Sequence, residues 1–199
     1  HPIVAHRLIE GYGLTEPVAN RILDLAAPGV VLTIDCGSSD RAQIQRLKES
    51  GYSVIVTDHH AIPVDGGAEN ADAFVSPLRE CSHYTDTTIA GVSVVFLLMW
   101  ALRRELIDRG LGPFSSLAPL LDFAGAGVQG DCVSLRSHNN RAMIRESLAR
   151  INARTRPCWN VLLDHILEPG SLFRSENISF ALIPRINARS RVDEPLEGL

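Results

Sequence analysis

Two apolar runs early in the chain each end in an acidic residue. The runs VVLTID (residues 30–35) and SVIVTD (residues 53–58) are rich in β-branched residues and show no in/out alternation. Continuous runs of this kind are typical of parallel strands that are covered on both faces of a sheet. The pattern therefore predicts two buried parallel strands, with Asp35 and Asp58 at their ends.

The segment between these strands has a helical pattern. Apolar positions in residues 41–51 recur at near-helical spacing, and the segment ends at a glycine that can stop a helix. Gly37 permits a tight turn before this helix, and Ser38 or Ser39 can cap it. Residues 30–60 are therefore predicted to form one βαβ unit.

The remaining sequence favours one more strand and then helices. AFVSP (residues 73–77) has the pattern of a third, shorter strand. We expect helices at residues 89–104, 116–125 and 140–151. The segment ISFALIPRINARSR (residues 178–191) starts like a strand and breaks at Pro184. The predicted fold class is α/β, with a parallel, Rossmann-like sheet flanked by helices and a mainly helical C-terminal extension.

The composition argues against a membrane-spanning, secreted or disulfide-rich protein. The longest apolar run among the 199 residues is IAGVSVVFLLMWAL, shorter than the roughly 20 residues of a membrane span, so it predicts a buried helix. No signal-peptide pattern opens the chain, and the four cysteines are widely spaced without a C-x-x-C pair. A disulfide framework or zinc ribbon is therefore not favoured, and we expect a cytoplasmic protein with reduced thiols and no membrane association.

Charge is unevenly distributed along the chain. The net charge is −4, residues 1–135 are acidic, and residues 136–199 carry an excess of arginine, with Lys48 the only lysine. An acidic part and an arginine-bearing part would suit a cation site beside a phosphate-binding surface. A general bias towards arginine over lysine explains the same counts.

The strand ends carry the candidate chemistry. Ligands bind outside the carboxyl ends of open parallel sheets, where Asp35 and Asp58 are followed by His59 and His60. Carboxylate oxygens with imidazole nitrogens suit Mn²⁺, and Mg²⁺ where oxygens and water dominate. A strand-end aspartate alone is often a helix cap and a histidine pair is often a surface turn, but the combination favours a metal site. Asp131, after the small residues of AGAGVQG, is a third candidate acid or an ordinary turn residue.

An ordered series of stretches resembles a known family. They are RLIEGYGL, LTIDCGSSD, VIVTDHH, TIAGVSVVFLLM, GVQGDCVSL and FALIPRINARSR. Together they resemble the DHH phosphoesterase superfamily and, within it, RecJ-type exonucleases that digest single-stranded DNA from 5′ to 3′ in repair and recombination. The resemblance implies a phosphodiester hydrolase that uses two Mn²⁺ or Mg²⁺ ions about 3.5–4 Å apart. It also implies single-stranded DNA as substrate, and repair or replication proteins such as a single-strand-binding protein as partners.

The resemblance also implies a role for each candidate residue. Asp35 would bridge the two ions, and His59 and Asp131 would be further metal ligands. His60 would face the scissile phosphate, and Asp58 would orient the histidine pair. The residues implied in nucleic-acid or phosphate binding are Arg185, Asn187 and Arg191, to which the turn residues Ser38 and Ser39 are added because a helix N-terminus can bind an anion.

Three features depart from the family pattern. The family's first motif, D-x-D, is absent, as is its C-terminal substrate-binding domain. We therefore expect residues 1–135 to be a DHH catalytic domain without its first strand, and residues 136–199 a connector towards an absent domain. We also expect this chain alone to be inactive or nearly so. Arg189 and Ser190 replace a small residue and a glycine, which puts the backbone conformation of that segment in question.

Two alternatives stay open at this point. One is a DHH phosphodiesterase that acts on short oligonucleotides or cyclic dinucleotides. The other is a catalytically inactive DHH module that serves as a scaffold in a repair or replication assembly. The missing D-x-D motif would favour the scaffold if this chain were the whole protein. The presence of an intact set of site residues argues against it: Asp35, Asp58, His59, His60 and Asp131.

Overall fold

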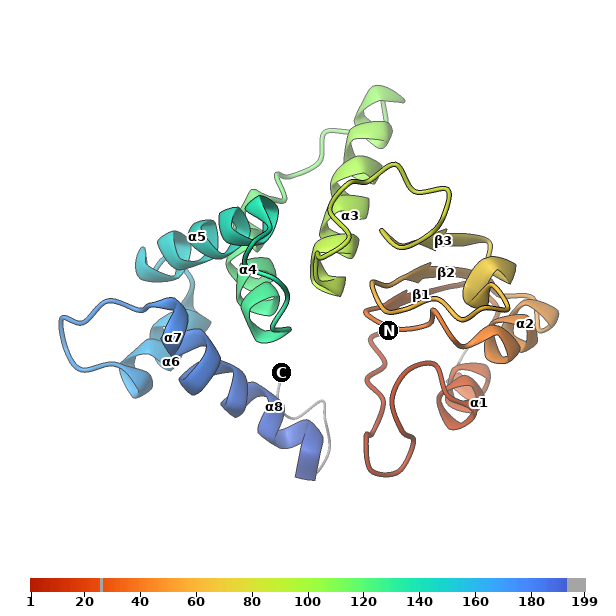
Figure 1. Cartoon of the computed structure of the whole chain (residues 1–199), viewed down its shortest axis with the longest axis horizontal. Helices are drawn as coiled ribbons and strands as arrows, with labels where there is room; N and C mark the ends of the chain where they lie inside the picture. Colours follow the sequence, from red (N-terminus) through yellow and green to blue (C-terminus); the bar gives the residue numbers. More distant parts are fainter. Residues whose placement is uncertain (26, 193–199) are drawn as a thin grey trace. The chain divides into compact units, whose positions relative to one another are not determined.

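The computed structural model describes residues 1–25 and 27–192, and of residues 189–192 it describes the backbone alone. The chain divides into two compact units. The first consists of residues 1–87 with the described residues from Ile186 onward, and the second of residues 88–185. Figure 1 traces the chain from the N-terminus, in red, to α8, in blue.

The first unit is built around one parallel sheet. Its elements are α1 (Glu16–Leu25), β1 (Val30–Ile34), α2 (Arg41–Glu49), β2 (Ser53–Thr57), the 3₁₀ turn η1 (Gly67–Asn70) and β3 (Ala73–Val75). The strand order is β1-β2-β3, and both pairs are parallel (Figure 1). Ile34 pairs with Thr57 at the carboxyl ends of β1 and β2. Asp35 and Asp58 therefore leave the sheet at the same edge, and the predicted α/β class with a parallel sheet is confirmed.

The two faces of β1 differ in how they are covered. The main core of this unit joins apolar residues of α1, α2 and the sheet, among them the fully buried Leu47 and Val56. On the other face Val30, Leu32 and Ile34 are 70%, 38% and 51% exposed. The prediction that both strands are covered on both faces is therefore wrong for β1. A run of β-branched residues indicates that a strand forms, but it does not show what packs on each face of that strand.

The second unit is helical. Its elements are α3 (Gly91–Asp108), the 3₁₀ turn η2 (Ala118–Leu120), α4 (Leu121–Gly130), α5 (His138–Asn152), α6 (Pro157–Ile166), the short α7 (Ser175–Asn177), the π-helix η3 (Ile178–Leu182) and the first residues of α8 (Ile183–Val192). The predicted helices at 89–104 and 140–151 correspond to α3 and α5. The predicted helix at 116–125 begins as η2 and runs on as α4 to Gly130. Helices α1, α6 and α7 were not predicted from the sequence.

The segment that was predicted to begin as a strand is helical. Residues Ile178–Leu182 form η3, and α8 follows directly. Ile178 and Leu182 are both buried in the core of the second unit, as their spacing of four residues allows on one helix face. Pro184 is the second residue of α8 and directly follows the π-helix η3, so the helical chain continues through it. The predicted strand and break are therefore wrong.

Asp122 joins α4 to α6 through a buried carboxylate. The side chain is 3% exposed and accepts hydrogen bonds from Arg156 Nε at 2.6 Å and from Trp159 Nε1 at 2.8 Å. The Arg156 guanidinium also lies over the Phe123 ring, 4.8 Å from its centroid. A buried acid is stable in a protein when it is paired and hydrogen-bonded in this way.

The small residues of α4 allow a close helix contact. A methyl group at Gly125 would meet the carbonyl oxygen of Met143 in α5 and would lie 2.5 Å from Cβ of Ser147. The Ser147 hydroxyl donates a 2.6 Å hydrogen bond to the carbonyl oxygen of Asp122, which ties α5 to α4. At Gly125, the glycine therefore permits helix packing.

Two further observations concern the class of protein. None of the described helices combines the length and the apolar character that crossing a membrane requires. All four cysteines are free thiols.

We predict that Gly125→Ala destabilises the second unit. Alanine favours an isolated helix by about 1 kcal/mol over glycine, but overpacking against an immobile backbone costs about 1–3 kcal/mol. We expect a lower denaturation midpoint, measured by tryptophan fluorescence, since Trp100 and Trp159 both lie in this unit. Gly29→Ala is the control, because nothing lies within 4 Å of its added methyl group. A Gly125→Ala midpoint equal to that of the unchanged protein would contradict the packing account.

Candidate metal centre at the strand ends

Asp35 turns out of the sheet directly after β1. Its φ angle is 62°, a left-handed conformation that is uncommon for residues other than glycine. The Asp35 N–H donates to the carbonyl oxygen of Thr57 at 3.0 Å, and the Thr33 hydroxyl donates to the carbonyl oxygen of Cys36 at 2.8 Å. The first bond holds the end of β1 against the end of β2, and the second closes the turn that follows β1.

Gly37 completes the turn in a conformation that requires glycine. Its φ angle is 109°, and an added Cβ would lie 2.8 Å from Thr33 Oγ1 and 3.0 Å from Val56 Cγ1. The turn brings the Ser38 N–H to Oδ2 of Asp58, at 2.9 Å. The sequence prediction of a tight turn at Gly37 is consistent with this geometry.

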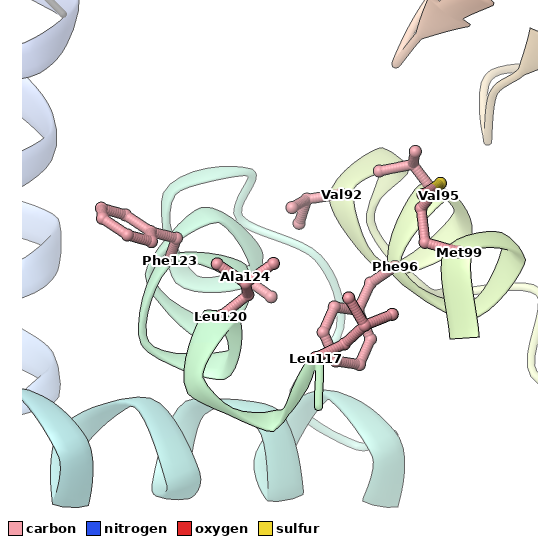
Figure 2. A pocket seen from close by; sticks show the side chains of 8 residues that line it. All are labelled: Val92, Val95, Phe96, Met99, Leu117, Leu120, Phe123 and Ala124. Atoms are coloured by element: carbon pink, nitrogen blue, oxygen red, sulfur yellow. The ribbon is translucent and has the colours of Figure 1, made fainter. Parts of the chain in front are cut away.

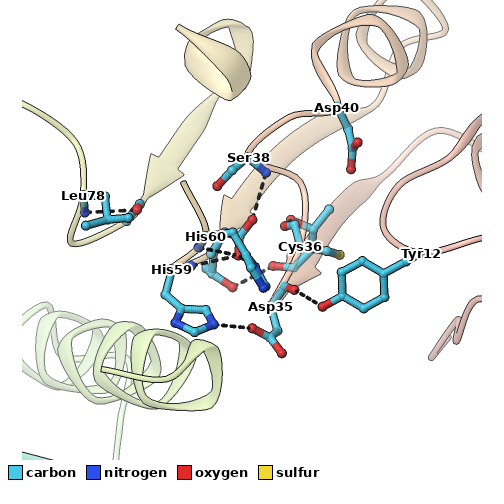
Figure 3. A network of polar contacts seen from close by, with 12 residues as sticks. Tyr12, Asp35, Cys36, Ser38, Asp40, His59, His60 and Leu78 are labelled. Carbon is cyan, nitrogen blue, oxygen red and sulfur yellow. Dashed lines mark hydrogen bonds and ion pairs between the residues drawn. The ribbon is translucent and has the colours of Figure 1, made fainter. Parts of the chain in front are cut away.

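Asp58 is the hydrogen-bonding centre of the site. It is 1% exposed, and its Oδ1 accepts from the N–H groups of His59 at 2.8 Å and of His60 at 3.2 Å. Nδ1 of His60 lies 2.7 Å from the same oxygen (Figure 3). Burial alone would raise the pKa of Asp58, but the hydrogen bonds from Ser38 and His60 outweigh it and hold the pKa below its usual value. Asp58 is thus an ionised carboxylate committed to orienting the histidine pair.

The bond to Asp58 defines the tautomer of His60. An ionised carboxylate can only accept, so we assign the ring proton to Nδ1. The lone pair of Nε2 then points away from Asp58. The side chain of His60 is 48% exposed, which leaves this ring edge accessible to a ligand.

Asp35, His59 and His60 form a cluster of potential metal ligands. One atom of each lies within 4.8 Å of the others, and Nε2 of His59 is 3.2 Å from Oδ1 of Asp35 (Figure 3). Two ligands of an octahedral ion, each about 2.1 Å from it, lie about 3 Å apart. One carboxylate with imidazole nitrogens therefore fits Mn²⁺ well.

Two neighbours of this cluster were not predicted from the sequence. The Tyr12 hydroxyl donates to the carbonyl oxygen of Asp35 at 3.1 Å, and its ring contacts that of His60 edge-on, with centroids 6.2 Å apart. Burial, with the nearby carboxylates of Asp58, Asp40 and Asp35, raises the pKa of the Cys36 thiol to about 12. A lone tyrosine some 20 residues before the strand end carries no spacing signal, and Cys36 resembles any small buried residue.

The turn before α2 is capped differently from the prediction. The N-cap residue is Asp40, and its side chain makes no capping hydrogen bond, since Oδ2 accepts from the Leu14 N–H at 2.8 Å. Ser38 is 1% exposed and its N–H is committed to Asp58, whereas Ser39 is exposed. Their suggested contact with phosphate stays a prediction.

The other predicted residues lie outside the cluster. Asp131 is an exposed residue at the C-terminal end of α4, in the second unit. Arg185 is exposed in α8 and donates from Nη1 to the carbonyl oxygen of Ala181 at 2.6 Å, and Asn187 is partly buried in the same helix. The Arg191 side chain lies outside the described residues. The metal and phosphate roles of these residues stay predictions.

An apolar pocket in the second unit has no counterpart in the predicted site. It has a volume of about 260 Å³ and lies between α3 and the η2–α4 segment (Figure 2). Phe96 and Met99 line it from α3, and Leu120 and Phe123 from the opposite side. The lining is apolar throughout and offers no group for metal or phosphate chemistry.

The sequence is similar to known proteins. The sequence matches the DHH family, N-terminal domain, over residues 3–121. It is 36% identical to the single-stranded-DNA-specific exonuclease RecJ of Salmonella typhimurium, over 99% of this chain and 34% of that protein. The RecJ of Thermus thermophilus is 37% identical, over 100% of this chain and 27% of that protein. The chain thus spans about a third, or less, of the length of these relatives.

A solved structure is also similar. It is a crystal structure of exonuclease RecJ bound to manganese, with a TM-score of 0.81 and 31% sequence identity. The match covers 100% of this chain and 47% of that chain. Beyond the sequence, the arrangement of helices and strands described above is therefore similar to that of a manganese-binding exonuclease.

We predict that Asp58→Asn disrupts the histidine pair. The NH₂ group of asparagine would face one of the N–H groups from which Asp58 now accepts a hydrogen bond. Because two donors would then face each other, we expect the free energy of unfolding to fall by about 2–3 kcal/mol. Imidazole ¹⁵N shifts should show that His60 no longer favours the Nδ1–H tautomer. Asp72→Asn is the matched control, since Asp72 accepts the Val54 N–H at 2.7 Å in the same unit but is exposed. Unchanged His60 shifts in Asp58→Asn would contradict the assignment.

We predict that Cys36 resists alkylation in the metal-free protein. Its raised pKa leaves almost no thiolate at pH 8, whereas Cys81, Cys132 and Cys158 are exposed. Iodoacetamide labelling followed by peptide mass spectrometry should modify those three first, and Cys36 only after unfolding in urea. Labelling of Cys36 as fast as Cys81 would contradict the burial described here.

Proposed function

The chain belongs to the DHH family, and from that premise we propose that it is part of a divalent-metal-dependent exonuclease of the RecJ type. The proposed substrate is single-stranded DNA, digested from the 5′ end. The observation that carries the proposal is the cluster of Asp35, His59 and His60 at the carboxyl ends of two parallel strands. The relatives named as single-stranded-DNA-specific exonucleases support the substrate.

The metal in this proposal is Mn²⁺ or Mg²⁺. Asp35 and His59 would hold it, with Asp131 as a further ligand, and the similar crystal structure is of an exonuclease bound to manganese. When bound, such ions lower the pKa of a water molecule and offset negative charge on the phosphodiester. The Asp35 carboxylate and the His59 imidazole, whose ligand atoms lie in one cluster, support this choice of metal.

His60 is the residue that would act on the substrate directly. Asp58 fixes its ring through Nδ1, so Nε2 is the atom presented to the phosphate. Nε2 can accept a proton from an attacking water molecule or, once protonated, donate a hydrogen bond to a phosphate oxygen. The Asp58 carboxylate holds the ring in this orientation, 2.7 Å from Nδ1, as a buried carboxylate does beside a catalytic histidine.

The DNA backbone would be bound by the arginine-bearing segment. Arg185 uses one Nη1 hydrogen bond within α8, and the side chain is otherwise exposed. Arg185 and Arg191, with Asn187, would contact phosphate oxygens, because a planar guanidinium pairs with two of them at once. Ser38 and Ser39 would add donors at the turn. We also propose a cytoplasmic location, consistent with four free thiols, and repair or replication partners such as a single-strand-binding protein.

The activity of the full-length protein tests this proposal. With Mn²⁺ it should degrade a 5′-phosphorylated single strand, and His59→Ala or Asp131→Ala should each reduce the rate more than about 100-fold because a metal ligand is lost. His83→Ala is the control, since His83 is exposed and outside the cluster. Gel analysis of 5′- and 3′-labelled strands gives the direction of digestion.

Two results would contradict the proposal. Retained nuclease activity in both variants would contradict the ligand assignment. Hydrolysis restricted to short oligonucleotides or cyclic dinucleotides would contradict the RecJ-type substrate and favour the other phosphodiesterase function.

A further inference from the structure

We propose that Tyr12 is a positioning residue of the metal centre, which holds the main chain of Asp35 and the ring of His60 in place. The inference rests on the proposed function, since it assigns a role at the same site. Tyr12 belongs to none of the helices or strands and was not among the predicted site residues. It reaches the site from the loop that precedes α1.

This loop is fastened on both sides of Tyr12. Before it, the N–H groups of Ile9 and Glu10 donate to the carbonyl oxygen of His6, and Glu10 pairs with Arg21 of α1 at 3.2 Å. After it, the Leu14 N–H donates to Asp40 Oδ2 at 2.8 Å. The loop is therefore tied both to α1 and to the turn that follows Asp35.

Two glycines shape the tip of the loop. Gly11 and Gly13 have φ angles of 85° and 92°, which residues other than glycine rarely adopt. Tyr12 lies between them, and its hydroxyl reaches across to the end of β1 (Figure 3). A backbone that is fixed on both sides presents the side chain with little loss of conformational entropy.

The hydroxyl meets Asp35 at the strained point of the site. The left-handed conformation of Asp35 is unfavourable for a residue that carries a side chain, so its surroundings must hold it. The Asp35 N–H is held by Thr57, and its carbonyl oxygen accepts from the Tyr12 hydroxyl at 3.1 Å. With both peptide groups fixed, the carboxylate is directed towards His59, 3.2 Å away.

The ring of Tyr12 adds a contact on the other side of the cluster. It meets His60 edge-on at 78°, while Asp58 holds Nδ1 of the same imidazole. Edge-to-face contacts of this kind are favourable between aromatic rings. Tyr12 is 60% exposed, so its contribution to the core is small and a positioning role accounts better for these contacts.

The test compares two tyrosine-to-phenylalanine variants of this chain. Tyr12→Phe removes the hydroxyl next to Asp35 and keeps the ring. Tyr52→Phe is the matched control, because it removes a hydroxyl that donates to the carbonyl oxygen of Ile22 at 3.3 Å in the core of the same unit. Mn²⁺ affinity is measured by isothermal titration calorimetry, and thermal unfolding by circular dichroism.

We expect opposite patterns in the two variants. Tyr12→Phe should weaken Mn²⁺ binding about 10-fold, as loss of a group that supports a metal ligand does, with little change in the unfolding temperature. Tyr52→Phe should lower the unfolding temperature and leave Mn²⁺ affinity unchanged. In the metal-free protein, Tyr12→Phe should also shift the carbonyl ¹³C resonance of Asp35.

The outcomes separate this inference from the proposed function. If the unchanged chain binds no Mn²⁺, the strand-end cluster alone is not a metal site, and the Asp35 carbonyl shift in metal-free Tyr12→Phe then decides the positioning role. If it binds Mn²⁺ and Tyr12→Phe binds equally well with the Asp35 resonance unshifted, the positioning role is wrong. Tyr12→Ala, which also loses the ring contact with His60, should weaken Mn²⁺ binding more than Tyr12→Phe, and equal binding by the two variants would show that the ring has no part in positioning.

Discussion

The candidate site depends on one buried carboxylate. Asp58 accepts hydrogen bonds from the Ser38 and His59 main chain and from both the main chain and ring of His60. A buried charge without such partners would be strongly destabilising, so the turn after β1 and the histidine pair after β2 must form together around it. The same bonds keep Asp58 ionised and direct Nε2 of His60 outward. The ends of β1 and β2, the turn after β1 and the orientation of the His60 ring therefore all depend on Asp58.

The sheet supplies the precision that this arrangement needs. Parallel pairing sets Ile34 opposite Thr57, so the residues that follow β1 and β2 emerge level with each other. Gly37 then allows the chain to turn where any side chain would meet Thr33 and Val56. Asp35 lies between the paired end of β1 and the turn at Gly37, and it adopts a left-handed conformation there. The functional groups lie on short segments, but rigid strands determine where those segments begin.

Much of this could be predicted from the sequence, and the exceptions have physical causes. The strands, α2 and the meeting of Asp35 with His59 follow from β-branched runs and parallel pairing. The open face of β1 could not be predicted, because an apolar run does not show what covers it. Pro184 suggested a break but lies in the first turn of α8, directly after η3. The contact between Tyr12 and Asp35 depends on a loop fold without periodicity. The roles of Asp131, Arg185, Asn187 and Arg191 remain predictions.

Pulsed electron paramagnetic resonance of bound Mn²⁺ tests the central claim most directly. In a chain labelled with ¹⁵N-histidine, the account predicts a hyperfine coupling to an imidazole nitrogen that disappears in His59→Ala and persists in His83→Ala. A bound ion without nitrogen coupling, or a coupling that survives His59→Ala unchanged, would contradict the claim that His59 holds the ion at the strand ends.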